Sequence, residues 1–391
     1  MLSRLAGKLY GEADDRNNLY RLRDELKAAG HEIVDLISGN INEQGFCFPQ
    51  NLIEEILVSA SRRCSVYRPD SFGQPAAREA VSGYYSRQGV TLDPGSILIT
   101  PGTSLSYWYC FKLLADEGDE ILCPCPSYPL FDYIAMMSGV KLVHYPLLET
   151  DNWRIDLEKL ETLVSAKTRA VVLISPHNPT GHVSSTEEID GLAGIARRHE
   201  LAVISDEVFG DFLMARDPLP RPVGSGAPLV FTLNGFSKML ALPGMKFGWM
   251  AVSGDPGRVG KALRSLELMS DTFLPVNEIV QAAAPDFFQL GNAVRFELGH
   301  RVRQSWMLAE MFLAEESPHW SCVKPRGGFY VTLRLHEADE EQAAERILRE
   351  HHVLVHPGYF YDMAARHLVF CFAQKPELLE DAIPKILRTI S

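Results

Sequence analysis

The chain has 391 residues, 46% of them hydrophobic and 23% charged, which is enough for one large core and a smaller second domain. Its formal net charge of −12 makes a nucleic-acid partner unexpected, because proteins that bind phosphate backbones usually present a basic surface. We expect no membrane segment and no secretion signal, since residues 1–18 lack an apolar core and no uncharged apolar run approaches about 18 residues.

The cysteines suggest a reducing, cytoplasmic environment. There are seven, an odd number, and they are scattered through apolar contexts rather than paired at regular spacings. Cys123 and Cys125 form a C-x-C pair, but prolines interleave them and no second pair follows at zinc spacing. We therefore expect no metal site.

The N-terminal part is predicted to contain a helix and a short strand. The helix covers residues 17–29, where Leu19, Leu22 and Leu26 share one face and Gly30 suits a helix C-cap. A strand-like apolar run follows at 33–37.

From about residue 75 the pattern alternates between helices and strands. Helices are expected at 76–87, 105–115, 156–164 and 186–199. Short apolar runs lie between and after them, at 96–100, 120–123, 141–145, 170–174, 202–205, 229–233 and 247–252. Strands of this length separated by helices predict a mostly parallel, seven-stranded sheet covered on both faces, which is a three-layer α/β/α domain.

Beyond Pro275 the pattern changes to long helices, predicted at 277–290 and 293–315. Strands near 329–333, 353–355 and 367–373 and a helix at 376–390 follow them. We interpret residues 62–290 as the large domain, and residues 1–61 with 291–391 as a smaller α+β domain.

Polar loops follow several of the predicted strands. The segment Pro101-Gly102-Thr103-Ser104 opens a helix, and backbone N–H groups at a helix N-terminus bind phosphate. A plain helix cap would look the same. Asn178 stands between two prolines that stiffen its turn, Asp206 ends a strand, and Lys238 can form an imine with a carbonyl compound. In parallel sheets such strand ends form ligand sites.

In this order and spacing, the loops resemble aminotransferases of class I/II, which depend on pyridoxal 5'-phosphate (PLP) and have fold type I. The motifs are Asn178-Pro179-Thr180-Gly181, Asp206-Glu207-Val208, Ser237-Lys238 and the segment 243–249. Gly39-Asn40, Tyr128-Pro129-Leu130 and the segment 234–238 are most similar to the alanine aminotransferase branch. The resemblance extends over nearly the whole chain.

The resemblance implies a role for each motif residue. Lys238 would hold PLP as a Schiff base and transfer the proton, Asp206 would pair with the pyridine nitrogen, and Tyr128 would stack on the ring. Asn178 would bind the ring's 3-oxygen, with Phe209 beside it, and would contact substrate together with Gly39. The implied phosphate ligands are Gly102, Thr103, Ser104, Ser237, Lys246 and, from the partner subunit of a homodimer with shared active sites, Tyr67.

The chain departs from the family pattern at three positions. Phe209 stands where the family usually has a tyrosine, and Lys246 where it usually has an arginine. Val369 stands where an arginine usually binds the substrate carboxylate. Three explanations are open: Arg366 takes over through a shifted register, Arg326 reaches the site, or the substrate has no α-carboxylate or is bound elsewhere.

The sequence thus predicts a PLP-dependent aminotransferase (EC 2.6.1.-) that moves an amino group from an amino acid or related amine to a 2-keto acid. The alternative is a PLP-dependent lyase, cyclase, decarboxylase or oxidase with a specialised substrate, which Val369 and Phe209 motivate. A non-enzymatic effector domain is a third alternative, against which Lys238 and Asp206 both argue.

Overall fold

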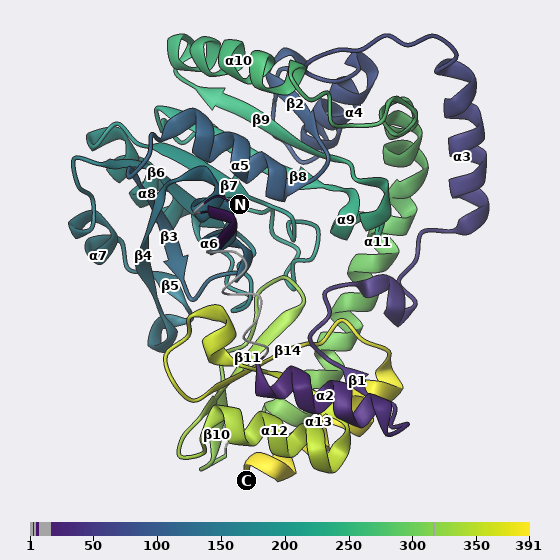
Figure 1. Ribbon diagram of the computed structural model, residues 1–391, viewed down its shortest axis with the longest axis vertical. Coiled ribbons are helices and arrows are strands. Elements are labelled where there is room, and N and C mark those ends of the chain that lie inside the picture. Colours follow the sequence, from purple (N-terminus) through teal and green to yellow (C-terminus); the bar gives the residue numbers. More distant parts are fainter. Residues whose placement is uncertain (1–2, 4, 8–16, 316) are drawn as a thin grey trace.

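The computed structural model describes residues 3, 5–7, 17–315 and 317–391, and Figure 1 shows their arrangement. The segment for which no secretion signal is expected, residues 1–18, lies largely outside these ranges. The eight-stranded sheet occupies the upper part of the view, and a four-stranded sheet with helices lies at the lower end. None of the helices in the described ranges combines the length and apolar character that a membrane crossing needs.

The large sheet has the strand order β2-β9-β8-β7-β6-β3-β4-β5. Its parallel strands are β3 (Glu120–Cys125), β4 (Lys141–Leu148), β6 (Thr168–Ile174), β7 (Ala202–Asp206) and β8 (Leu229–Gly235). Antiparallel strands at the edges are β2 (Ile97–Thr100) and β9 (Gly248–Gly254) on one side and β5 (Arg154–Ile155) on the other. The mostly parallel sheet is confirmed; it has eight strands rather than seven because two-residue β5 pairs with the end of β4.

The central strands of the sheet are buried because helices cover both of its faces. Every residue of β7 and β8 is buried. The helices that connect or flank these strands are α4 (Pro75–Ser86), α5 (Thr103–Leu114), α6 (Leu130–Ser138), α7 (Leu157–Thr162), α8 (Thr186–Arg198), α9 (Phe236–Met239) and α10 (Pro256–Asp271). Two large apolar clusters on opposite sides of β7 and β8 hold this layer together.

One helix of 36 residues, α11 (Glu278–Leu313), replaces the two helices predicted in this region. The prediction placed a break at Gly291-Asn292, but the helix continues through Pro285 and Gly291 because it packs along α3 (Gln50–Arg63), α4 and α13 (Pro376–Ile390). In Figure 1, α11 runs from beside the large sheet down to the lower layer.

The lower layer combines the C-terminal strands with N-terminal elements. Its four-stranded sheet has the order β10 (Trp320–Cys322), β11 (Tyr330–Leu335), β14 (His367–Cys371) and β13 (His356–Pro357). A separate two-stranded sheet pairs β1 (Val34–Asp35) with β12 (Val353–Leu354), and α2 (Asn18–Ala28) packs on α12 (Glu340–His351). These contacts bring Gly39, which follows β1, to the carboxyl edge of the large sheet, where it meets Lys238.

Candidate active site

A cavity of about 320 Å³ lies where the parallel strands end. Its lining comes from loops far apart in the sequence: the end of β7, the start of α5, the turn after β6, α9 and the segment after β1. The residues that line it are Gly39, Asn40, Thr103, Ser104, Tyr107, Tyr128, Leu130, Phe131, Ile134, Ile174, Asn178, Asp206, Val208, Phe209, Ser237, Lys238 and Tyr330.

Lys238 lies in α9, directly after β8, and its ammonium group faces this cavity. Its Nζ donates a hydrogen bond of 2.5 Å to the carbonyl oxygen of Gly39. A Cβ at position 39 would lie 2.6 Å from the Tyr330 hydroxyl and 3.0 Å from Nζ, so a side chain there would displace these groups. Burial lowers the pKa of Lys238, which favours the neutral amine that attacks carbonyl groups.

Asp206 is the last residue of β7, and its carboxylate is buried. The Tyr107 hydroxyl donates to its Oδ2 and the Val208 backbone N–H donates to its Oδ1, each at 2.9 Å. Burial raises the pKa of Asp206 to about 6, and these two hydrogen bonds oppose the rise. A carboxylate in such a place is suited to pairing with a cationic group in the cavity.

Hydroxyl and amide groups surround the remaining walls. Thr103 and Ser104 stand in the first turn of α5, where backbone N–H groups have no partner within the helix, and Ser237 on α9 lines the same cavity. Gly102 precedes this turn with a φ of 152°, and β9 approaches it so closely that a Cβ at Gly248 would lie 2.9 Å from its Cα. These groups form a cradle for a phosphate.

Asn178 and two aromatic residues define the middle of the cavity. The Asn178 Oδ1 atom is buried without a hydrogen-bond partner among the described residues, so this oxygen is available to accept a hydrogen bond from a ligand. Tyr128 is 44% exposed and offers its ring to the cavity, and Phe209 packs edge-on against Phe329 at 4.9 Å between ring centroids. The unpartnered amide, the buried carboxylate, the lysine and the phosphate cradle together fit PLP.

The structure brings together nine of the thirteen site residues proposed from the sequence. Tyr67, Gly102, Lys246 and Arg366 do not line the cavity. Gly102 is adjacent to it through Thr103, whereas Lys246 is exposed in a left-handed conformation. Tyr67 is 68% exposed.

Arg366 is directed away from the cavity. It is exposed, and its Nη1 donates to the carbonyl oxygen of His336 at 2.8 Å. The shifted register proposed for it is not observed, because β14 pairs with β11 in unbroken register from His367 to Cys371. The geometry therefore does not support Arg366 as a substrate ligand, and Arg326 also lies outside the lining.

Tyr107 and Tyr330 are site residues that the sequence reasoning missed. Tyr107 follows Thr103 by four residues, so both side chains lie on one face of α5, and this spacing could have revealed it. Tyr330 lines the cavity, and its hydroxyl donates to the Ile37 carbonyl oxygen at 3.2 Å.

The fold and the site define a PLP enzyme in which the cofactor-binding lysine, Lys238, directly follows strand β8 of the large sheet. The sequence matches the family model for class I and II aminotransferases over residues 31–386. The chain belongs to this family and is a PLP-dependent aminotransferase. The comparisons give no support to a lyase, cyclase, decarboxylase or oxidase.

Several relatives carry aminotransferase names. The glutamate-pyruvate aminotransferase AlaA of Haemophilus influenzae is 29% identical over 97% of this chain and 95% of that protein. The alanine aminotransferase of Mycobacterium bovis is 30% identical over 90% of this chain and 83% of that protein. A solved structure of alanine aminotransferase from Pyrococcus furiosus matches with a TM-score of 0.91, 25% identity and coverage of 100% and 99% of the two chains.

Proposed function

We propose that this cavity transfers an amino group from an amino acid or related amine to a 2-keto acid through Lys238. The observation that carries the proposal is that Lys238 and Asp206 face one cavity, lined also by Tyr128 and Asn178. PLP, when bound, supplies an aldehyde that reacts with amines and a ring that withdraws electrons. Lys238 would then move the proton at the donor's Cα, since burial lowers the pKa of its amine and so favours the neutral form that accepts a proton.

The other residues hold and orient the cofactor in this proposal. Asp206 would pair with the ring nitrogen, Tyr128 would stack on the ring and Asn178 would donate to the 3-oxygen through its amide nitrogen. Thr103, Ser104 and Ser237, with the N–H groups of α5, bind the phosphate. Phe209 cannot add the second hydrogen bond that a tyrosine would give to the 3-oxygen, which costs about 0.5–1.5 kcal/mol.

The proposed reaction is tested by titrating the PLP-loaded protein with a panel of amino acids and amines. A donor is expected to reduce the visible absorbance of bound PLP, and pyruvate or 2-oxoglutarate is expected to restore it. The names of the relatives favour alanine and glutamate as first donors. An absorbance that falls but never recovers with any 2-keto acid would contradict transamination.

We predict that Val369→Arg improves simple amino acids as donors. Val369 is buried on β14 at the position where the family usually has the arginine that binds the substrate carboxylate, so an arginine there would restore that group. A bidentate pair with the donor carboxylate should raise kcat/KM for alanine at least about tenfold.

Two matched variants accompany this test. Val369→Met supplies length without charge and should give no gain. Arg366→Ala should change kcat/KM by less than about twofold, because exposed side chains away from the site contribute little. A folded Val369→Arg protein that binds PLP without any gain for alanine would show that the donor carboxylate is held elsewhere.

We also propose a cytoplasmic homodimer, with residues 62–290 as the large domain and residues 1–61 and 291–391 as the small one. All seven cysteines are free, as a reducing compartment allows, and the two larger sheets fall in separate segments of the chain. Exposed Tyr67 lies beside Leu274 at a shallow cavity, a surface suited to a partner subunit.

Shared active sites predict complementation between two impaired variants. Tyr67→Ala should weaken PLP binding about tenfold through loss of one phosphate contact, and Lys238→Ala should be inactive. A mixed dimer of the two variants would contain one native site, so mixing after unfolding and refolding should restore activity with full PLP affinity. Activity that never exceeds that of Tyr67→Ala alone would argue against sharing.

A further inference from the structure

A second cavity, of about 920 Å³, lies between α11 and the loop that connects β7 to β8. None of its lining residues belongs to the active-site cavity or to the surface around Tyr67. It is lined by Asp211, Ala215, Arg216, Asn292, Ala293, Arg295, Phe296, Gly299, His300 and Arg303. Arginines thus gather in one cavity of a chain whose formal net charge is −12.

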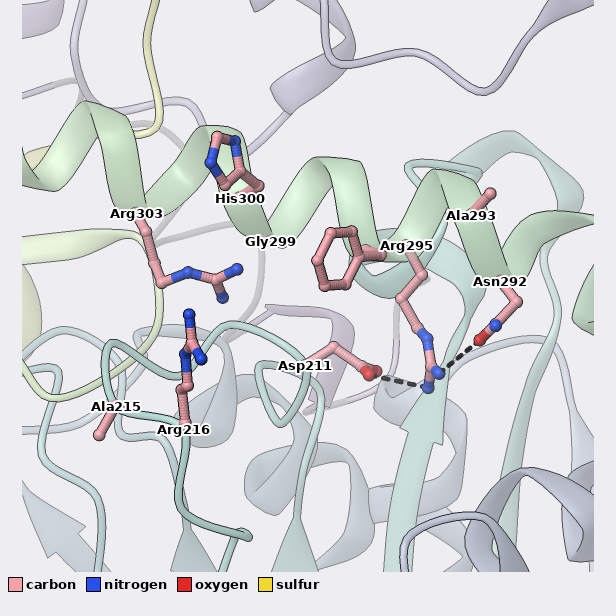
Figure 2. A pocket seen from close by; sticks show the side chains of 10 residues that line it. Asp211, Ala215, Arg216, Asn292, Ala293, Arg295, Gly299, His300 and Arg303 are labelled. Carbon is pink, nitrogen blue, oxygen red and sulfur yellow. Dashed lines mark hydrogen bonds and ion pairs between the residues drawn. The ribbon is translucent and has the colours of Figure 1, made fainter.

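Figure 2 shows the guanidinium groups of Arg216 and Arg303 facing each other across this cavity. Neither has an ion-pair partner among the described residues, and Arg303 makes only a long hydrogen bond, 3.5 Å from its Nη1 to the Leu213 carbonyl oxygen. Like charges that face each other repel unless an anion lies between them. The two arginines therefore favour an anion between them.

The acidic lining residue cannot serve these two arginines. Asp211 accepts a hydrogen bond from the Tyr84 hydroxyl at 2.9 Å and another from Arg295 Nη1 at 3.0 Å. Arg295 is held in turn by Asn292, as Figure 2 shows. Asp217, on the rim of an adjoining cavity, forms no ion pair with Arg216, although both line that cavity. No carboxylate among the described residues therefore balances the positive charge of Arg216 and Arg303.

The same cavity offers flat apolar surface beside the arginines. Phe296 is 72% exposed and lies one turn before His300 on α11, so both rings border the cavity. Gly299 keeps the floor open, because a Cβ there would lie 3.3 Å from the Asp211 carbonyl oxygen and 3.4 Å from Arg303 Nη1. An exposed aromatic ring next to unpaired arginines suits a ligand that is both aromatic and anionic.

We propose that this cavity binds a nucleotide, with its phosphates between Arg216 and Arg303 and its base on Phe296. Paired guanidinium forks match phosphate oxygens, and an exposed ring stacks on a base. The volume of about 920 Å³ is much larger than an inorganic phosphate needs and lies within the usual range for small-molecule sites. The proposal does not depend on which amino donor the enzyme uses.

The test is calorimetric titration of the PLP-loaded enzyme with ATP, sodium tripolyphosphate and adenosine. ATP should bind once per chain, tripolyphosphate at least about tenfold more weakly, and adenosine not measurably at about 1 mM. The visible absorbance of bound PLP should stay constant throughout. Absence of ATP binding at about 1 mM, equal affinity for tripolyphosphate, or release of PLP by ATP would each overturn the proposal.

Variants locate the site. Arg216→Ala and Arg303→Ala should each weaken ATP binding at least about tenfold, and Phe296→Ala should weaken ATP but not tripolyphosphate. Arg349→Ala is the matched control, since Arg349 is an exposed arginine on α12 outside the cavity, and it should bind ATP normally. If an alanine variant fails to fold, Arg216→Gln and Arg303→Gln replace it. Unchanged ATP affinity in a folded variant of either arginine would overturn the assignment.

Discussion

Lys238→Ala is expected to abolish transamination, with a loss of about 10⁴-fold or more, and to remove the visible absorbance of bound PLP. Lys238 is both the amine that would anchor the cofactor and the group that would move the Cα proton. Of the residues that line the cavity, it is the one lysine, so no neighbour can replace it. Absorbance spectra and single-turnover rates measure the two losses separately.

The fold should survive this change. Nζ makes one hydrogen bond, to Gly39, while burial disfavours its charge, so the two effects on stability oppose each other. Lys238→Arg retains a cation that cannot form the imine, and it should be as inactive as the alanine variant. Lys261→Ala, at an exposed position on α10, should behave as the wild type. A folded Lys238→Ala protein that kept the PLP absorbance would show that another amine anchors the cofactor.

The residues that could be predicted from the sequence are those fixed by local structure. Asp206 ends a buried parallel strand, and Asn178 and Lys238 follow such strands within a few residues, so recognising the strand also places the side chain at the sheet's carboxyl edge. The positions that the sequence reasoning placed wrongly depend on packing between distant segments. The orientation of Arg366 is set by its contact with His336, thirty residues earlier in the chain, which no local pattern reports.

The long helix illustrates the same limit in the fold. The local sequence Gly291-Asn292 predicts a helix end, yet α11 continues through these residues. Gly291 is buried where a Cβ would lie 2.9 Å from Leu240 and 3.0 Å from Phe48, so glycine allows close packing there rather than ending the helix. Tertiary contact outweighs the helix propensity of one residue, which is about 1 kcal/mol for glycine.

Asp206→Asn is expected to lower kcat by about 10²–10³-fold while stabilising the PLP-free protein above pH 6. The lost activity follows from removing the carboxylate that would pair with the ring nitrogen, a change of about 3–5 kcal/mol for a buried ion pair. The gain in stability follows from the pKa of Asp206, which burial raises to about 6 in the folded chain. Asparagine retains the shape of the side chain without its charge.

The direction of the pH effect follows from that raised pKa. The folded protein binds the Asp206 proton more tightly than the unfolded chain, so its stability falls as the pH rises from about 4 to about 6 and then stays level. The difference between the ordinary pKa of 3.8 and about 6 corresponds to about 3 kcal/mol. Thermal unfolding of the PLP-free wild type and Asp206→Asn should therefore differ at pH 8 and converge near pH 4.

Tyr107→Phe provides the matched control for this pH effect. It removes a hydrogen bond that favours the ionised carboxylate, so it should make the PLP-free protein less stable at pH 8 but not near pH 4. Bound PLP should make the wild type more stable than Asp206→Asn at pH 8. A cationic ring nitrogen would pair with the ionised Asp206 but not with an uncharged asparagine. A stability difference between wild type and Asp206→Asn that is constant from pH 4 to pH 8 would show that Asp206 does not titrate near pH 6.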